Sequence, residues 1–151
     1  MWLKWFIATL HLLGLPLGLG AVWARARALW GVRMATDLSA VFAADNLWGL
    51  AAVLWIATGL VRVFGGIEKG AAYYLHDRAF YIKMTLFVII LLLEVWPMAA
   101  LIRWRIRIRR GVSINIAPAR VLARISAVQA GLVYSVRMVK AAGSAISYVQ
   151  R

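Results

Sequence analysis

Three long runs of apolar residues dominate the pattern along this chain. They extend over residues 5–23, 47–64 and 80–102, and few charged side chains interrupt them. Each run is close to the ~20 residues that an α-helix needs to cross a hydrocarbon layer of ~30 Å. The pattern therefore predicts three membrane-spanning helices that are joined by short connections.

A fourth helix is predicted over residues 121–140, where apolar residues recur at helical spacing. Charged residues on this helix leave only residues 125–136 free of charge, which is short for a membrane span. The helix either crosses with its arginines reaching the headgroups or lies in the interface as a basic amphipathic helix; we favour crossing. The expected fold is an all-α integral membrane four-helix bundle, with one transmembrane domain over residues 1–151.

Two local patterns predict how these helices continue and pack. Arginine alternates with apolar residues over 103–110, which is typical of a strand. A helix whose arginines snorkel into the headgroups is the favoured interpretation directly after a membrane span. Gly14 and Gly18 form a small-xxx-small pair, which predicts close packing against another helix.

Tryptophan is frequent, with eight residues in the chain. Most of them lie near the ends of the apolar runs, where an amphipathic ring is expected at headgroup level. These are Trp2, Trp5, Trp23, Trp30, Trp48, Trp96 and Trp104. Trp55 is the exception, because it falls in the middle of a run.

The charge balance is strongly basic, with 18 Lys and Arg against 5 Asp and Glu. In a soluble protein this excess would suggest binding to nucleic acid. Here the basic residues flank the spans, so we expect anionic lipid as the partner and no nucleic acid. Most arginines fall in the connections 24–46 and 103–120, which predicts that both connections are cytoplasmic. The N-terminus would then be periplasmic, in a bacterial inner membrane.

Ionisable residues inside a bilayer are costly and usually face the interior of a bundle. His11, Lys83 and Glu94 are such residues, and the predicted topology places His11 and Lys83 in the same leaflet as Arg62 and His76. Each has a plainer explanation. His11 can hydrogen-bond a neighbouring helix, Lys83 can snorkel to phosphates, and His76 can be solvated in a loop.

Two acidic residues suggest contacts inside the bundle. Asp45 begins the second span near Arg25 and Arg27, which predicts an ion pair that closes this end of the bundle. Glu94 lies deeper, and its position is compatible with a pairing or proton-handling role. The chain has no Cys, so thiolate metal sites are excluded, and two histidines alone make a poor transition-metal site but suffice for a haem.

Several short motifs together resemble a family of small bacterial membrane proteins that is catalogued as a domain of unknown function. They are Asp45-Asn46-Leu47-Trp48-Gly49, Thr58-Gly59-x-x-Arg62, Glu68-Lys69-Gly70, Tyr73-Tyr74-x-His76, Lys83, and His11 with Gly14. The resemblance covers roughly residues 4–110. The family is distantly similar to the protoporphyrinogen oxidase of bacterial haem synthesis and to copper-resistance membrane proteins. The oxidase type is known for a first-helix His and a third-helix Lys at its haem b, which by position fall on His11 and Lys83.

The resemblance implies a haem b-binding protein in porphyrin handling or membrane electron transfer. His11 would be an axial ligand of the haem iron. Lys83 or His76 would be the second ligand, or would neutralise a haem propionate together with Arg62. The alternative is a non-enzymatic accessory subunit that packs on other membrane-protein subunits, and a third function is ion or proton transport through Glu94 and Asp45. The sequence leaves open whether the protein is an enzyme.

Overall fold

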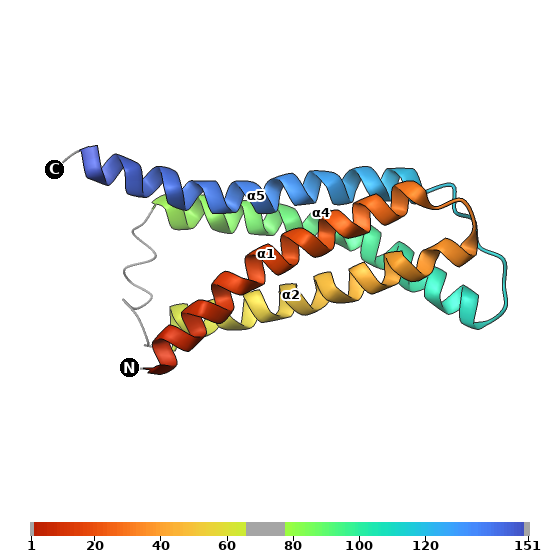
Figure 1. The fold of residues 1–151 in the computed structure, drawn as a ribbon, viewed down its shortest axis with the longest axis horizontal. Helices are drawn as coiled ribbons and strands as arrows, with labels where there is room; N and C mark the ends of the chain where they lie inside the picture. The colour runs from red at the N-terminus through yellow and green to blue at the C-terminus, as the bar shows by residue number, and fades with distance from the viewer. Residues whose placement is uncertain (1, 66–77, 150–151) are drawn as a thin grey trace.

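The computed structural model describes residues 2–65 and 78–149, and within these residues it is all-helical and contains no strand. Four long α-helices and one short 3-10 helix make up this part of the chain (Figure 1). They are α1 (Trp2–Gly31), η1 (Ala35–Asp37), α2 (Leu38–Phe64), α4 (Arg78–Arg109) and α5 (Ala119–Val149). The prediction of an all-α four-helix bundle is confirmed.

Helices that follow one another along the chain run in opposite directions (Figure 1). α1 packs along α2 and along α5, and α4 packs along α5. The ends of α1 and α4 therefore lie at the same end of the bundle as the starts of α2 and α5, and we call this the arginine end. The starts of α1 and α4 lie with the ends of α2 and α5 at the other end, which we call the histidine end.

Three stretches are long and apolar enough to cross a membrane: Trp2–Gly31, Ala35–Phe64 and Phe80–Arg109. Their outward surfaces are apolar too, and Leu50 and Leu92 are examples that are more than half exposed. A soluble protein rarely leaves so much apolar surface exposed, whereas lipid covers it without cost. α5 is not among these three stretches, but it packs along both α1 and α4 as a bundle helix does.

Two groups of apolar side chains fill the interior. One lies at the arginine end and includes Leu29, Val41 and Leu101. The other lies nearer the middle and includes Val22 and Ile90. Together they join residues from all four long helices.

Two tryptophans that were expected at headgroup level belong instead to this interior, so the prediction was wrong for them. Trp48 and Trp104 are only 7% and 6% exposed. Trp48 lies against Gly18, where an added Cβ would come within 3.1 Å of the indole ring. Trp104 packs in the group at the arginine end, with Leu29 among its members. By contrast, Trp2, which was also expected at headgroup level, is 86% exposed.

The glycine pair in α1 packs against α2, as predicted. A Cβ on Gly14 would lie 3.3 Å from Cβ of Trp55, and the Gly18 position faces Trp48 in the same way. The absence of side chains at both positions lets two bulky indoles lie close to the α1 backbone.

The arginine-rich stretch after the third span is helical, because α4 continues to Arg109. Gly111 follows shortly after the end of this helix and has a φ of 67°. The backbone N–H of Val112 bonds the carbonyl of Arg107 at 3.0 Å, and such bonds with a left-handed glycine are typical of helix C-termini. Most of the stretch that follows, up to Ala117, is non-helical.

Replacing Gly18 with leucine should destabilise the protein, because the new side chain would collide with the Trp48 ring. We expect the free energy of unfolding to fall by roughly 1–3 kcal/mol, the usual cost of overpacking. Gly20→Leu is the matched control, since nothing lies within 4 Å of an added Cβ there. Thermal unfolding of both variants in the same detergent tests this; equal losses would contradict the packing described.

Candidate functional site

Arg25 forms the most extensive polar contact among the described residues. Its side chain comes from α1 and is completely buried. Nε donates to Oγ of Ser126 at 3.1 Å. Nη1 donates to Asp45 at 2.9 Å and to Glu94 at 2.7 Å, while Nη2 donates to Glu94 at 2.7 Å and to Gln129 at 2.9 Å. A guanidinium carries five N–H groups, so every donor of Arg25 is used, and its partners lie on α2, α4 and α5.

The acceptors around Arg25 are satisfied as well. Glu94 also accepts a bond from Nε2 of Gln129 at 2.8 Å. The second oxygen of Asp45 accepts a bond from Nη2 of Arg105 at 2.8 Å, and Nη1 of Arg105 donates to Asn46 at 2.8 Å. Two guanidiniums therefore face two carboxylates, and the cluster carries no net charge. This balance is what allows charged groups to lie inside a membrane bundle.

The sequence anticipated this cluster in part. Of the two arginines expected near Asp45, Arg25 forms the ion pair and Arg27 is exposed. Glu94 also pairs with Arg25. One guanidinium bridges the two acids, Asp45 and Glu94, which lie on different helices. Ser126 and Gln129 were missed as partners. Their spacing of three residues, which places both on one face of α5, was the available signal.

His11 is half-buried and faces α2. Its Nδ1 lies 3.0 Å from Oγ1 of Thr58, so the hydrogen bond to a neighbouring helix that we considered is present. The imidazole also stacks on Trp55, with ring centroids 5.8 Å apart. A Cβ on Gly59 would lie 3.4 Å from Cε1 of His11, so this glycine lets the imidazole lie close to the α2 backbone.

Trp55 links the histidine to α4. Its ring meets Phe87 edge-on, with centroids 5.5 Å apart. The indole Nε1–H is buried and has no hydrogen-bond partner in the part of the chain that the structure describes. An unpaired buried donor is costly, so the N–H marks a position where an acceptor would be stabilising.

Helix register places two cations towards the histidine end of α4 and α2. Lys83 precedes Phe87 by four residues and Arg62 follows Thr58 by four, so each lies one turn closer to the histidine end on the same helix face. Both side chains are half-buried. His76, the remaining predicted site residue, lies outside the described residues.

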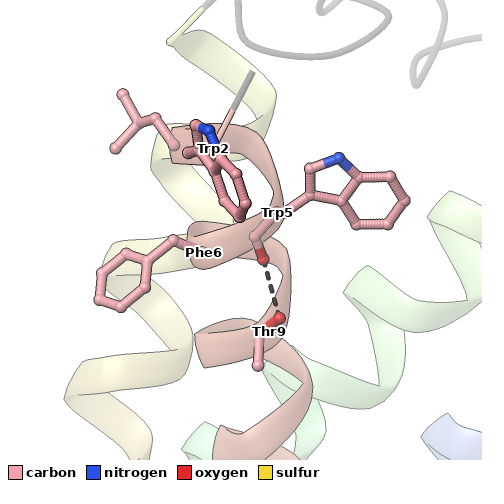
Figure 2. A pocket seen from close by; sticks show the side chains of 5 residues that line it. Trp2, Trp5, Phe6 and Thr9 are labelled. Carbon is pink, nitrogen blue, oxygen red and sulfur yellow. Dashed lines mark hydrogen bonds between the residues drawn. The ribbon is translucent and has the colours of Figure 1, made fainter.

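The tip of α1 carries an open apolar hollow (Figure 2). It is lined by Trp2, Leu3, Trp5 and Phe6, while the Thr9 hydroxyl donates to the carbonyl of Trp5 at 2.8 Å. No charged side chain lines the hollow, and exposed tryptophans at a helix end are typical of the headgroup layer. Within the described residues, no group of three or more His, Cys, Asp or Glu side chains could hold a metal ion.

Arg25→Lys should destabilise the fold although it keeps the charge. Lysine offers three donors in place of five, and each buried acceptor left unsatisfied costs ~1–3 kcal/mol. We expect a loss of about 2–4 kcal/mol in the free energy of unfolding. Arg27→Lys is the matched control, since Arg27 is exposed and should change stability by no more than about 0.5 kcal/mol. Both variants are compared by unfolding in detergent. Similar losses of unfolding free energy would contradict a stabilising role for the hydrogen bonds of Arg25.

Comparison with known proteins gives one match. The family model described as "Predicted membrane protein (DUF2214)" matches residues 3–145. Searches of the curated proteins and of the solved structures return no match. The family match covers all four long helices almost completely, and it agrees with the three membrane-span candidates. The chain therefore belongs to the DUF2214 family of predicted membrane proteins.

Proposed function

We propose that this protein binds haem b at the histidine end of the bundle, in porphyrin handling or membrane electron transfer. The observation that carries the proposal is the position of His11, Lys83 and Arg62 towards that end of three helices, all of them half-buried. A histidine with two cations matches the chemistry of haem b, which offers an iron for imidazole and two propionates for basic side chains.

The surroundings of His11 suit a flat aromatic ligand. The imidazole is held between a hydrogen bond to Thr58 and the face of Trp55, so its orientation is fixed before any ligand arrives. Trp55 and Phe87 supply apolar aromatic surface beside His11. These residues would contact a porphyrin bound through His11.

In this proposal His11 would hold the iron. Lys83 or His76 would be the second ligand, or would pair with a haem propionate together with Arg62. The haem would supply one-electron chemistry, while the protein would set its position and its access to water. The resemblance to the protoporphyrinogen oxidase type supports the same assignment of His11 and Lys83, although kinship at the level of a fold does not carry function.

The proposal predicts a visible absorption spectrum. The protein expressed with ample haem, or titrated with haemin in mild detergent, should show a Soret band. His11→Ala should lose this band while keeping its thermal unfolding transition, and Arg124→Gln, a change at the opposite end, should keep both. Lys83→Met and His76→Ala identify the second ligand, since only the variant that removes it should lose a six-coordinate spectrum. A folded wild-type protein that binds no haemin would overturn the proposal and favour the accessory-subunit alternative.

We further propose that the arginine end faces the cytoplasm and contacts anionic phospholipid headgroups. Eight arginines at this end are exposed: Arg27, Arg33, Arg103, Arg107, Arg109, Arg110, Arg120 and Arg124. The nearby carboxylate of Asp37 accepts bonds from the backbone N–H groups of Arg33 and Met34, at 2.8 and 2.9 Å. Guanidinium binds phosphate in a bidentate manner, and basic residues beside membrane spans mark the cytoplasmic side.

Single cysteines test this orientation cleanly, because the chain has no Cys of its own. Leu3→Cys lies at the histidine end and Ser113→Cys in the connection at the arginine end, and both positions are exposed. In intact bacterial cells, a membrane-impermeant maleimide should label Leu3→Cys but should reach Ser113→Cys only after lysis. The reverse labelling pattern would contradict the proposed orientation.

A further inference from the structure

We infer that Thr58 is a positioning residue that fixes the tautomer of His11, with the proton on Nδ1 and the lone pair on Nε2. The inference concerns the protein itself, and it rests on the proposed function only for the identity of the group that Nε2 would bind. Thr58 is 8% exposed and lies on α2, opposite His11 on α1.

The Thr58 hydroxyl has a single proton to donate. Oγ1 lies 2.6 Å from the carbonyl oxygen of Leu54 and 3.2 Å from that of Trp55. Carbonyl oxygens only accept, so the hydroxyl proton is used within α2, in the bond to the preceding turn that threonine commonly makes in helices. Oγ1 can then offer only a lone pair to His11.

The contact between Oγ1 and Nδ1 at 3.0 Å therefore requires the imidazole to be the donor. A neutral imidazole with its proton on Nδ1 carries its lone pair on Nε2. Histidines that bind metals commonly donate their other N–H to an oxygen in this way, which orients the ring and strengthens it as a ligand. Thr58 would thus prepare His11 to bind iron through Nε2.

Two substitutions separate this role from simple packing. Thr58→Val keeps the branched shape but removes the oxygen, whereas Thr58→Ser keeps the oxygen and removes only a methyl group. If Thr58 acts through its hydroxyl, serine should preserve the tautomer of His11 and its binding of haemin, and valine should not. Thermal unfolding establishes that both variants fold.

The tautomer can be read in the protein without haem by ¹⁵N NMR of the labelled imidazole in detergent micelles. We expect wild type and Thr58→Ser to show a protonated Nδ1 and an unprotonated Nε2. Thr58→Val should shift the signals towards the opposite tautomer or a mixture. A wild-type His11 with its proton on Nε2, or a valine variant with unchanged signals, would overturn the inference.

Haem titration then tests the functional consequence. Thr58→Val should bind haemin about 10–100-fold more weakly than wild type, and its bound haem should have a more positive reduction potential. Thr58→Ser should stay close to wild type in both. If wild type binds haemin and the valine variant matches it in affinity and potential, ligand positioning fails while haem binding stands. If wild type binds no haemin, the proposed function fails, and the NMR result alone decides the tautomer assignment.

Discussion

The bundle depends on one buried guanidinium whose five N–H groups reach the other three long helices. Apolar packing discriminates poorly between helix arrangements in a membrane, because lipid tails are as apolar as leucine. Arg25 is different, since its charge is tolerable only where Asp45 and Glu94 are both present. The arrangement that brings these groups together is therefore strongly favoured over others that bury similar apolar surface.

The two ends of the bundle are held together by different kinds of contact. Near the arginine end, Arg105 of α4 bonds Asp45 and Asn46 of α2. Towards the histidine end, Trp55 of α2 meets Phe87 of α4 edge-on, and His11 of α1 lies within hydrogen-bond distance of Thr58 of α2.

Much of the fold could be predicted because lipid imposes simple constraints on sequence. Long runs without charge became helices, the Gly14 and Gly18 pair predicted a close helix contact, and the position of Asp45 predicted its bond to Arg25. The burial of Trp48 could not be predicted, because a tryptophan at the end of a run looks the same whether it faces headgroups or a glycine. The role of Gln129 depends on which face of α5 turns inward, and only packing decides that. For the histidine end, the sequence supplied the residues but not their partners, since Thr58 and Trp55 act through contacts between helices.

A double-mutant cycle between Arg25 and Glu94 tests the central claim most directly. Arg25→Met alone should be strongly destabilising, by roughly 3–5 kcal/mol, because it leaves a carboxylate buried without its partner. The double variant with Glu94→Gln keeps Arg105 to balance the charge of Asp45. It should therefore recover part of the lost unfolding free energy. The predicted coupling between the two positions is about 1–3 kcal/mol in the free energy of unfolding. Additive losses, with no coupling, would show that this guanidinium does not organise the bundle.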